Sequence, residues 1–234
     1  MEEIKKLKGI LTDLDETLYS YNPANKAGYK ALFSHIEQTE NKKTIEIEHA
    51  LEEAKNIVKR NCEHQGASHS RLLYIQYMVE KLLGKTDTKK IIERNKIYDT
   101  AYLEAMTPFP GMIDFLTQAK KNGLKICIIT DLTAEIQFKK IIRLGLEDII
   151  DFIVTSEEAG AEKPATKNFE MGLKKCGLEK SEVCMLGDST TTDIPGAQAA
   201  GIKKIFHKVI EKKGETPGAI QYETYQELKK IFNF

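Results

Sequence analysis

The sequence has no excess of charge of either sign. Lys and Arg together number 35 among the 234 residues, and Asp and Glu also number 35, so the formal net charge is +0. A protein that binds nucleic acid by broad neutralisation of phosphates carries a marked basic excess. The balance therefore argues against a nucleic-acid polymer as a partner and leaves only a local basic patch open.

Long apolar runs are also absent from the sequence. The longest ones fall far short of the roughly 20 residues that a membrane-spanning helix needs. The N-terminal stretch Met1–Lys6 leads into the first apolar run without a signal segment or a cleavage site. We therefore expect a cytoplasmic protein that does not associate with a membrane.

Cysteines at metal-binding spacing are missing as well. No two of the cysteines form a CxxC pair, and none has a histidine at the spacing of a zinc site. We expect reduced cysteines that pack as small apolar residues. The four are Cys62, Cys127, Cys176 and Cys184.

The pattern of apolar residues differs between two regions of the chain. Residues 7–13 have the composition of a buried strand that ends on Asp13, whereas residues 19–106 show almost no strand character. Apolar residues in the second region recur at helical spacing, in four consecutive patterns joined by short polar connections. This spacing predicts a small helical bundle. The first pattern consists of Tyr29, Leu32, Phe33 and Ile36.

Two prolines within Thr107–Gly111 mark the end of the bundle, because they disfavour a continuous helix. Short apolar strands then alternate with amphipathic helices. The predicted strands are 125–130, 152–154, 183–186 and 203–206. The first predicted helix begins at Met112 and ends at Asn122-Gly123. The others cover residues 134–144, 165–176, 191–200 and 222–232.

This alternation predicts an α/β fold, a Rossmann-like parallel sheet with helices on both faces. The first strand precedes the helical region and the others follow it. We therefore assign residues 1–18 and 107–234 to a core domain and residues 19–106 to an inserted α-helical bundle, the cap domain.

Acidic and hydroxyl residues gather where the predicted strands end. Ligands of open parallel sheets bind at the carboxyl ends of the strands, so we expect these side chains to converge. The first strand is followed by Asp13 and Asp15, the second ends in Thr130 and Asp131, and Glu162-Lys163-Pro164 precedes the strand that runs into Gly187, Asp188 and Asp193.

Carboxylates this close together cannot all stay ionised without a compensating charge. A hard divalent cation relieves the repulsion, and oxygen ligands favour magnesium. The same cation binds a phosphate monoester, and a carboxylate can attack its phosphorus to give an aspartyl-phosphate. A second carboxyl group two residues away can then exchange protons with the leaving group and with water.

Each of these features taken alone is common in proteins without this chemistry. Strand ends are often acidic turns, and a lysine before a proline is usually a surface residue. Their joint occurrence, in this order and each at a predicted strand end, is what favours a phosphate-transfer site.

The motifs resemble those of the haloacid dehalogenase superfamily of phosphohydrolases. Asp13-Leu-Asp15-Glu-Thr17-Leu18 is similar to its DxDxTL signature, Thr130 to its second-motif hydroxyl and Lys163 to its third-motif lysine. Gly187 through Asp193 is similar to its GDSxxxD motif. The segment between Tyr19 and Met106 resembles the helical cap of the subgroup whose cap follows the first motif.

The resemblance implies a role for each acid at the first and fourth strands. Asp13 is the nucleophile and a magnesium ligand. Asp15 is the general acid and base, and its backbone carbonyl is a second ligand of Mg2+. Asp188 is the third protein ligand.

The resemblance also implies a phosphate cradle. Thr130 and Lys163 hold the phosphoryl oxygens, and backbone N–H groups near Leu14 and Asp131 complete the cradle. Asp193, in the loop with Ser189, orients Lys163 or a metal-bound water. The chain departs from the family at Asp131, where many relatives carry Asn. This acid either points away from the phosphate or affects the choice of leaving group.

The preferred function is hydrolysis of a small-molecule phosphate monoester, of the nucleotide or sugar phosphate class, through an aspartyl-phosphate. A phosphosugar mutase of the same superfamily and a catalytically silent regulatory relative are the alternatives. The pair Glu16-Thr17, where such mutases tend to have Gly-Val, favours hydrolysis. The absence of G-x-G-x-x-G after the first strand argues against a dinucleotide-binding oxidoreductase.

The cap is expected to close over the site and to read the leaving group. Tyr19, Asn22 and Arg71 are its candidate substrate contacts, although a helix-end arginine such as Arg71 is more often only solvated. The run Gln137–Lys140 resembles the branch that contains pyrimidine nucleotidases and N-acylneuraminate-9-phosphatase. We expect a small phosphorylated metabolite as the partner, and a monomer or a homodimer.

Overall fold

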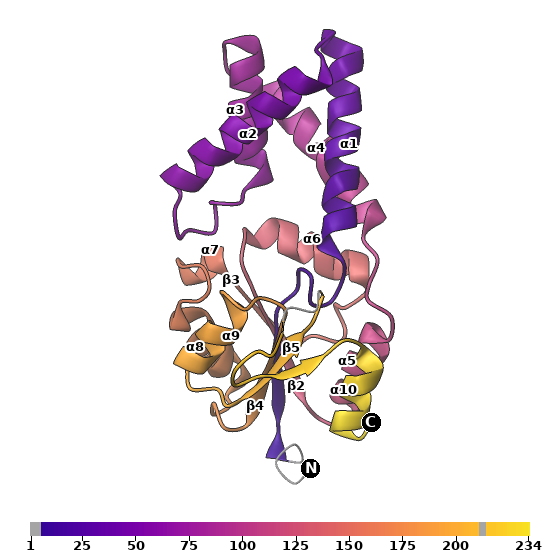
Figure 1. The fold of residues 1–234 in the computed structure, drawn as a ribbon, viewed down its shortest axis with the longest axis vertical. Coiled ribbons are helices and arrows are strands. Elements are labelled where there is room, and N and C mark those ends of the chain that lie inside the picture. The colour runs from indigo at the N-terminus through magenta and orange to yellow at the C-terminus, as the bar shows by residue number, and fades with distance from the viewer. Residues whose placement is uncertain (1–5, 211–213) are drawn as a thin grey trace. The chain divides into compact units, whose positions relative to one another are not determined.

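A computed structural model describes residues 6–210 and 214–234. The chain divides into two compact units (Figure 1). The core unit combines the described residues up to Ser20 with those from Thr107 onward, and the helical unit consists of Tyr21–Met106.

The core unit is built on a sheet in which every pair of neighbouring strands is parallel. Within the described residues the sheet has six strands in the order β3-β2-β1-β4-β5-β6. This arrangement confirms the predicted Rossmann-like α/β class. The strands are β1 (Gly9–Thr12), β2 (Lys125–Thr130), β3 (Phe152–Thr155), β4 (Val183–Gly187), β5 (Lys204–Lys208) and β6 (Ile220–Tyr222).

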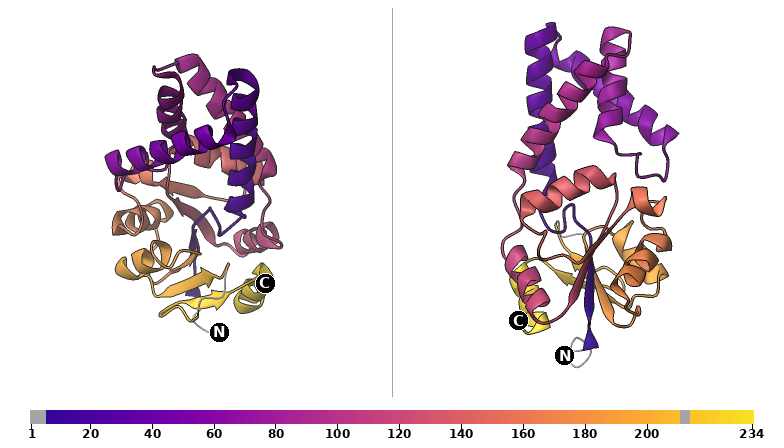
Figure 2. Two further views of the ribbon diagram at one scale, coloured as in Figure 1. Left: turned by 45° about the horizontal axis from the view of Figure 1, so that its top comes forward. Right: turned by 180° about the vertical axis from the view of Figure 1, so that it is seen from behind.

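The central strands are apolar because both faces of the sheet are covered. All residues of β1 and β4 are buried, and in β2 only Lys125 is exposed. Helices α8 and α9 pack on one side of the strands, whereas α5 packs on β2 and contacts α10 (Figure 2). The helices are α5 (Met112–Lys121), α6 (Ala134–Leu144), α7 (Ser156–Ala159), α8 (Thr166–Cys176), α9 (Asp193–Ala199) and α10 (Tyr225–Phe232).

One predicted helix begins too early. The helix expected from residue 222 starts at Tyr225, and Tyr222 is instead the last residue of β6, which adds to the edge of β5. The Thr224 hydroxyl accepts a hydrogen bond from the Glu227 N–H at 3.3 Å and thus caps α10. The signal for the boundary was this threonine with Glu three residues later. The short helix α7 was also missed.

The two segments that connect the units run side by side within the core unit. The Ser20 N–H donates to the Thr107 carbonyl at 3.4 Å, and the Phe109 N–H donates to the Leu18 carbonyl at 3.0 Å. Tyr19 bridges to Asp15 and to Pro108 in the same region. The loop after β1 and the two connecting segments are therefore tied to each other by backbone contacts.

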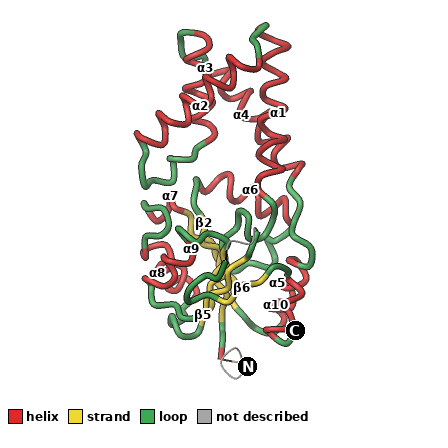
Figure 3. The backbone as a smooth tube through the Cα atoms, in the orientation of Figure 1, coloured by secondary structure: helices red, strands yellow, loops and turns green. Residues whose placement is uncertain are grey.

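The helical unit contains α1 (Tyr21–Glu40), α2 (Thr44–Asn61), α3 (Arg71–Leu83) and α4 (Thr88–Ala105). Residues 21–106 are all described and include no strand (Figure 3). Helix α1 packs on α4, and α2 packs on α3. A β-carbon at Gly28 would lie 2.7 Å from the Tyr98 ring, so glycine allows the close approach of α1 and α4.

No helix within residues 6–210 and 214–234 is both long and apolar enough to cross a bilayer. Three of the cysteines are buried as free thiols and Cys62 is half-buried.

Candidate active site

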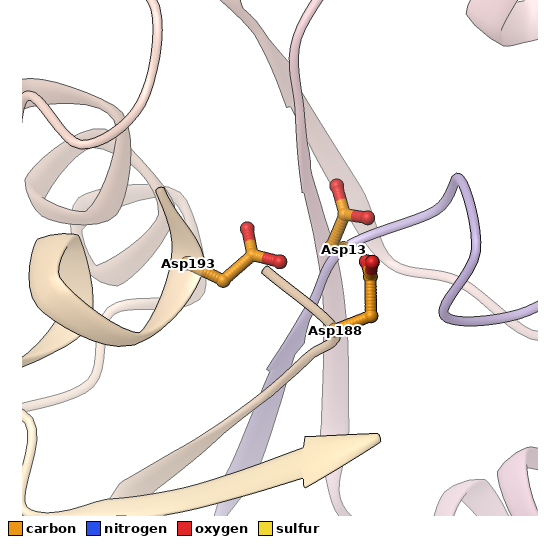
Figure 4. A group of neighbouring side chains, drawn as sticks. All are labelled: Asp13, Asp188 and Asp193. Atoms are coloured by element: carbon orange, nitrogen blue, oxygen red, sulfur yellow. The ribbon is translucent and has the colours of Figure 1, made fainter. Parts of the chain in front are cut away.

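The carboxyl ends of β1 and β4 bring three aspartates together. Asp13 follows β1, Asp188 follows β4, and Asp193 is the first residue of α9 (Figure 4). One carboxylate oxygen from each lies within 4.8 Å of the others. The parallel pairing of β1 with β4 explains this convergence, because it places Thr12 beside Leu186 and aligns the two strand ends.

Lys163 provides the buried positive charge of the site. Its ammonium lies 2.5 Å from Asp13 Oδ1 and 2.6 Å from Asp193 Oδ1, and it donates to the Ile129 carbonyl at 3.2 Å. Burial would lower the pKa of Lys163, but the charges of Asp13 and Asp193 outweigh it and hold the pKa well above the usual value. The lysine therefore stays cationic and bridges two carboxylates.

A tight loop after β4 positions Asp193. A β-carbon at Gly187 would lie 2.5 Å from the Asp193 β-carbon, so only glycine leaves room for the aspartate. The Ser189 N–H donates to Asp193 Oδ2 at 3.1 Å. The Ser189 hydroxyl in turn accepts from the N–H groups of Thr191 and Thr192. Ser189 thus organises the loop.

Asp188 lies at the least compensated position of the cluster. Thr17 donates to Asp188 Oδ1 at 3.2 Å and also contacts Asp13 Oδ2 at 3.4 Å. Burial and then the neighbouring Asp193 raise the pKa of Asp188 to about 7. The His207 ring lies 2.9 Å from the Asp188 carbonyl and fixes the backbone there.

The donor set fits a hard divalent cation. Asp193 is occupied by Lys163 and by the Ser189 N–H, whereas Asp13 Oδ2 and the Asp188 carboxylate are contacted only weakly, by one shared threonine hydroxyl. After burial, the charge of Asp188 is one of the causes that raise the pKa of Asp13, and such repulsion is relieved by a cation between the two carboxylates. Both offer only oxygen, which is the ligand that magnesium prefers.

Asp15 faces a different partner, Lys140 on α6. The Lys140 ammonium lies 2.7 Å and 2.8 Å from the two oxygens of Asp15, and the Tyr19 hydroxyl donates to Oδ1. Burial would raise the pKa of Asp15, but the charge and hydrogen bonds of Lys140 outweigh it and lower the pKa. The Asp15 carboxylate is therefore held from two sides, by the ammonium of Lys140 and by the hydroxyl of Tyr19.

The end of β2 provides a hydroxyl and a turn. Thr130 is buried, and its hydroxyl accepts a hydrogen bond from Gln137 Nε2 at 2.6 Å. The same amide donates to the Asp131 carbonyl at 2.6 Å. The Asp131 carboxylate accepts from the Lys163 N–H at 3.0 Å, so it supports the lysine loop.

Comparison with known proteins places this site in a family. The family model of the haloacid dehalogenase-like hydrolases matches residues 7–201, which include every site residue discussed above except His207. The chain belongs to this family. It is thus a hydrolase of the haloacid dehalogenase-like fold, as the strand-end motifs predicted.

Two archaeal relatives of this haloacid dehalogenase-like hydrolase match nearly its whole length. A ribulose-1,5-bisphosphate 5-phosphatase of Halopiger xanaduensis is 34% identical over 215 residues, which cover 90% of this chain and 88% of the relative. A glyceraldehyde 3-phosphate phosphatase of Methanocaldococcus jannaschii is 34% identical over 223 residues, with 94% and 92% covered. Both are named as phosphatases of small phosphorylated sugars.

The fold of the chain is similar to that of a solved structure of the same family name. The HAD phosphatase from Thermococcus onnurineus superposes with a TM-score of 0.72 at 22% identity, covering 96% of this chain and 97% of the other. At that identity the likeness concerns the fold alone.

The prediction from sequence missed four residues of this haloacid dehalogenase-like site. Thr17 enters the sequence prediction only as part of the first motif, and no sequence pattern indicates His207. Gln137 and Lys140 were used only as a hint of a branch, although both lie on the buried face of α6 with Ile141 and Leu144. Polar residues on an otherwise apolar helix face were the available signal.

The three residues predicted to contact the substrate do not all belong to the same unit. Tyr19 belongs to the core unit and is fully buried against Asp15. Asn22 is an exposed residue of α1 in the helical unit. Arg71 donates to the hydroxyls of Tyr21 and Tyr98 there. Contacts of Asn22 and Arg71 with a substrate stay predictions.

Proposed function

We propose that this protein is a magnesium-dependent phosphatase that cleaves a small phosphate monoester through an aspartyl-phosphate on Asp13. The convergence of Asp13, Asp188 and Asp193 around the buried ammonium of Lys163 carries the proposal. A site with this composition neutralises a phosphoryl group and holds a carboxylate beside it.

The first step is attack by Asp13. A carboxylate oxygen of Asp13 forms a bond to phosphorus, the bond from phosphorus to the ester oxygen breaks, and its electron pair leaves with that oxygen. Asp15, in its protonated form, gives the leaving oxygen its proton. Lys163 and Thr130 hold the phosphoryl oxygens during the transfer, and Lys163 balances their charge.

The second step returns the enzyme to its starting state. A water oxygen attacks the phosphorus of the aspartyl-phosphate and gives a proton to Asp15. The bond from phosphorus to the Asp13 oxygen breaks, which regenerates the Asp13 carboxylate and releases phosphate. Asp193 keeps Lys163 in place through both steps, because its Oδ1 accepts a hydrogen bond from the ammonium at 2.6 Å.

Magnesium would be held by the carboxylates of Asp13 and Asp188 and by the backbone carbonyl of Asp15. When bound, it supplies positive charge that lowers the repulsion between these acids and the phosphate. The raised pKa of Asp188 supports this assignment, because it reflects burial and then the neighbouring negative charge of Asp193, both of which a bound cation would offset.

The substrate class follows from the relatives. Both full-length relatives are named for phosphorylated sugars, one a pentose bisphosphate and the other a triose phosphate. We therefore propose a short-chain sugar phosphate as the substrate, and a nucleotide as the less favoured one.

The substitution Asp13→Asn tests the nucleophile. It keeps the shape of the side chain and removes its nucleophilic oxygen, so we expect kcat for p-nitrophenyl phosphate to fall by about 10⁴-fold or more. Asp114→Asn, at an exposed acid paired with Lys229, is the matched control and keeps full activity. Rapid quenching should trap a phosphorylated protein in the wild type and none in Asp13→Asn.

Removal of metal tests the cofactor. Activity should vanish with EDTA and return when magnesium is added in excess. A turnover rate that survives EDTA, or an Asp13→Asn protein that still accumulates a phosphorylated form, would refute the proposed site.

A further inference from the structure

Lys140 is a buried cation that the family motifs do not include. Its side chain is 1% exposed, and its ammonium contacts both oxygens of Asp15, at 2.7 Å and 2.8 Å. Helix α6 delivers it to the carboxyl edge of the sheet, since Gln137, one turn earlier, reaches Thr130 at the end of β2.

The presence of a lysine here is not explained by packing. Ile141 and Leu144 on the same buried face of α6 are apolar, Gln137 is neutral, and burial of a charged ammonium carries a large desolvation cost. An apolar residue of similar length would fill the same space without that cost. A buried ion pair retained at such a position is better explained by what it does to its partner.

Lys140 and Tyr19 contact Asp15 from separate elements. Tyr19 is fully buried in the segment after the nucleophile loop, and its hydroxyl donates to Asp15 Oδ1. The Lys140 ammonium lies 5.9 Å from the centre of the Tyr19 ring. Two donors on different elements restrict both side-chain torsions of the aspartate, so its carboxylate has one defined orientation.

The two buried lysines of the site divide its acids between them. Lys163 bridges Asp13 and Asp193, whereas Lys140 pairs with Asp15. The nucleophile and the proposed base are thereby kept from sharing one cation. Each carboxylate can then change its charge or its bonding without releasing the partner of the other.

We propose that Lys140 is a positioning residue that holds the Asp15 carboxylate in the orientation from which it takes a proton from the water that hydrolyses the aspartyl-phosphate. The inference rests on the proposed function and concerns its second step. In that step the water oxygen bonds to phosphorus, the bond to the Asp13 oxygen breaks, and the water proton passes to Asp15. Lys140 itself exchanges no proton.

The test is the substitution Lys140→Met with p-nitrophenyl phosphate as substrate. Nitrophenolate leaves without a proton, so formation of the aspartyl-phosphate does not need Asp15. We expect a rapid burst of about one nitrophenolate for each active site, followed by a steady rate reduced by roughly 10–100-fold. Phosphorylated protein should accumulate during the slow phase. Lys140→Arg, which keeps a cation with several donors, should restore part of the steady rate.

Two controls separate positioning from a loss of structure. Lys139→Met places the same change on the same helix, at a lysine paired with Glu135 at 2.8 Å on the exposed side, and should leave both phases unchanged. In an Asp15→Asn background, Lys140→Met should cause no further loss, because Lys140 acts only through Asp15.

Equal slowing of the burst and of the steady phase would overturn the proposal, and so would an added loss in the Asp15→Asn background. If Lys140→Met does not fold, Lys140→Gln takes its place and is judged by the same two phases. Failure of the proposed function looks different, because the wild type would then form no phosphorylated protein at all.

Discussion

The two units of this protein bury their charges in opposite ways. At the carboxyl ends of β1 and β4, the three clustered acids Asp13, Asp188 and Asp193 outnumber the lysine among them, Lys163, whose ammonium contacts Asp13 and Asp193. In the helical unit, cations outnumber acids around Glu40, which pairs with both Lys90 and Arg94.

This difference changes the pKa values of the acids in opposite directions. The pKa of Asp188 is raised to about 7 by burial and by Asp193, so the core cluster is unsatisfied without a further cation. Burial would also raise the pKa of Glu40, but the hydrogen bonds and charges of Arg94 and Lys90 outweigh it and lower the pKa. The core cluster thus has room for a further cation, whereas Glu40 already pairs with two cations of its own unit through one carboxylate oxygen.

Among the tests of this comparison, the largest effect is expected from removing Lys163, the lysine between Asp13 and Asp193. Lys163→Met leaves two buried carboxylates facing each other and removes the donor that balances the phosphoryl oxygens. We expect kcat for p-nitrophenyl phosphate to fall by about 10³-fold. Lys167→Met, at an exposed lysine of α8, is the control for a change of net charge and should retain activity.

If Lys163→Met kept more than a tenth of the wild-type rate, the claim that the buried charge of the core unit serves catalysis would be wrong. Arginine should not substitute well, because the ammonium fits between Asp13, Asp193 and the Ile129 carbonyl in a buried space. Rates measured at saturating substrate separate this loss from weaker binding.

The strand-end acids could be predicted from the sequence because their positions depend on strand ends alone. Asp13 and Asp188 follow apolar strands, and the parallel register then brings them together. Lys163 needed the family motif, since a lysine before proline has no periodic signal of its own.

Partners that come from helix faces could not be predicted in the same way. Lys140 meets Asp15 across 125 positions of sequence, and the pairing depends on where α6 lies above the end of β2. The pair of Glu40 with Arg94 likewise depends on the packing of α1 on α4. Periodicity predicts which helix face is buried, but not which polar residue on it meets which partner.

An intermediate effect, on stability and not on catalysis, is expected from Glu40→Gln in the helical unit. The change leaves Arg94, which is 1% exposed, without its carboxylate, and should lower the free energy of unfolding by about 3 kcal/mol. Denaturant titration measures the loss, and kcat for p-nitrophenyl phosphate should change less than about twofold, since the chemistry lies in the other unit.

The pH dependence of this stability has a defined sign. Because the pKa of Glu40 is lower in the folded than in the unfolded state, its contribution is complete above the unfolded value of about 4.3 and is lost as the pH falls through the lower folded value. Glu40→Gln should lack that part of the acid destabilisation. The double substitution Glu40→Met with Arg94→Met should recover much of the loss; a double variant less stable than Glu40→Gln would show that the pair does more than balance charge.

The smallest effect is expected at Asp131, the position where the sequence departs from many relatives. Its carboxylate accepts a hydrogen bond from the Lys163 N–H at 3.0 Å, and an amide oxygen can accept the same bond. Burial raises the pKa of Asp131, so the acid gains little from its charge. Asp131→Asn should therefore leave kcat within about threefold, whereas Asp131→Ala leaves a backbone N–H without its acceptor and should lower stability by about 1–3 kcal/mol. If Asp131→Asn instead changed kcat tenfold or altered the preference between aryl and alkyl esters, the negative charge of Asp131 would belong to the imbalance of the core cluster and not to its scaffold.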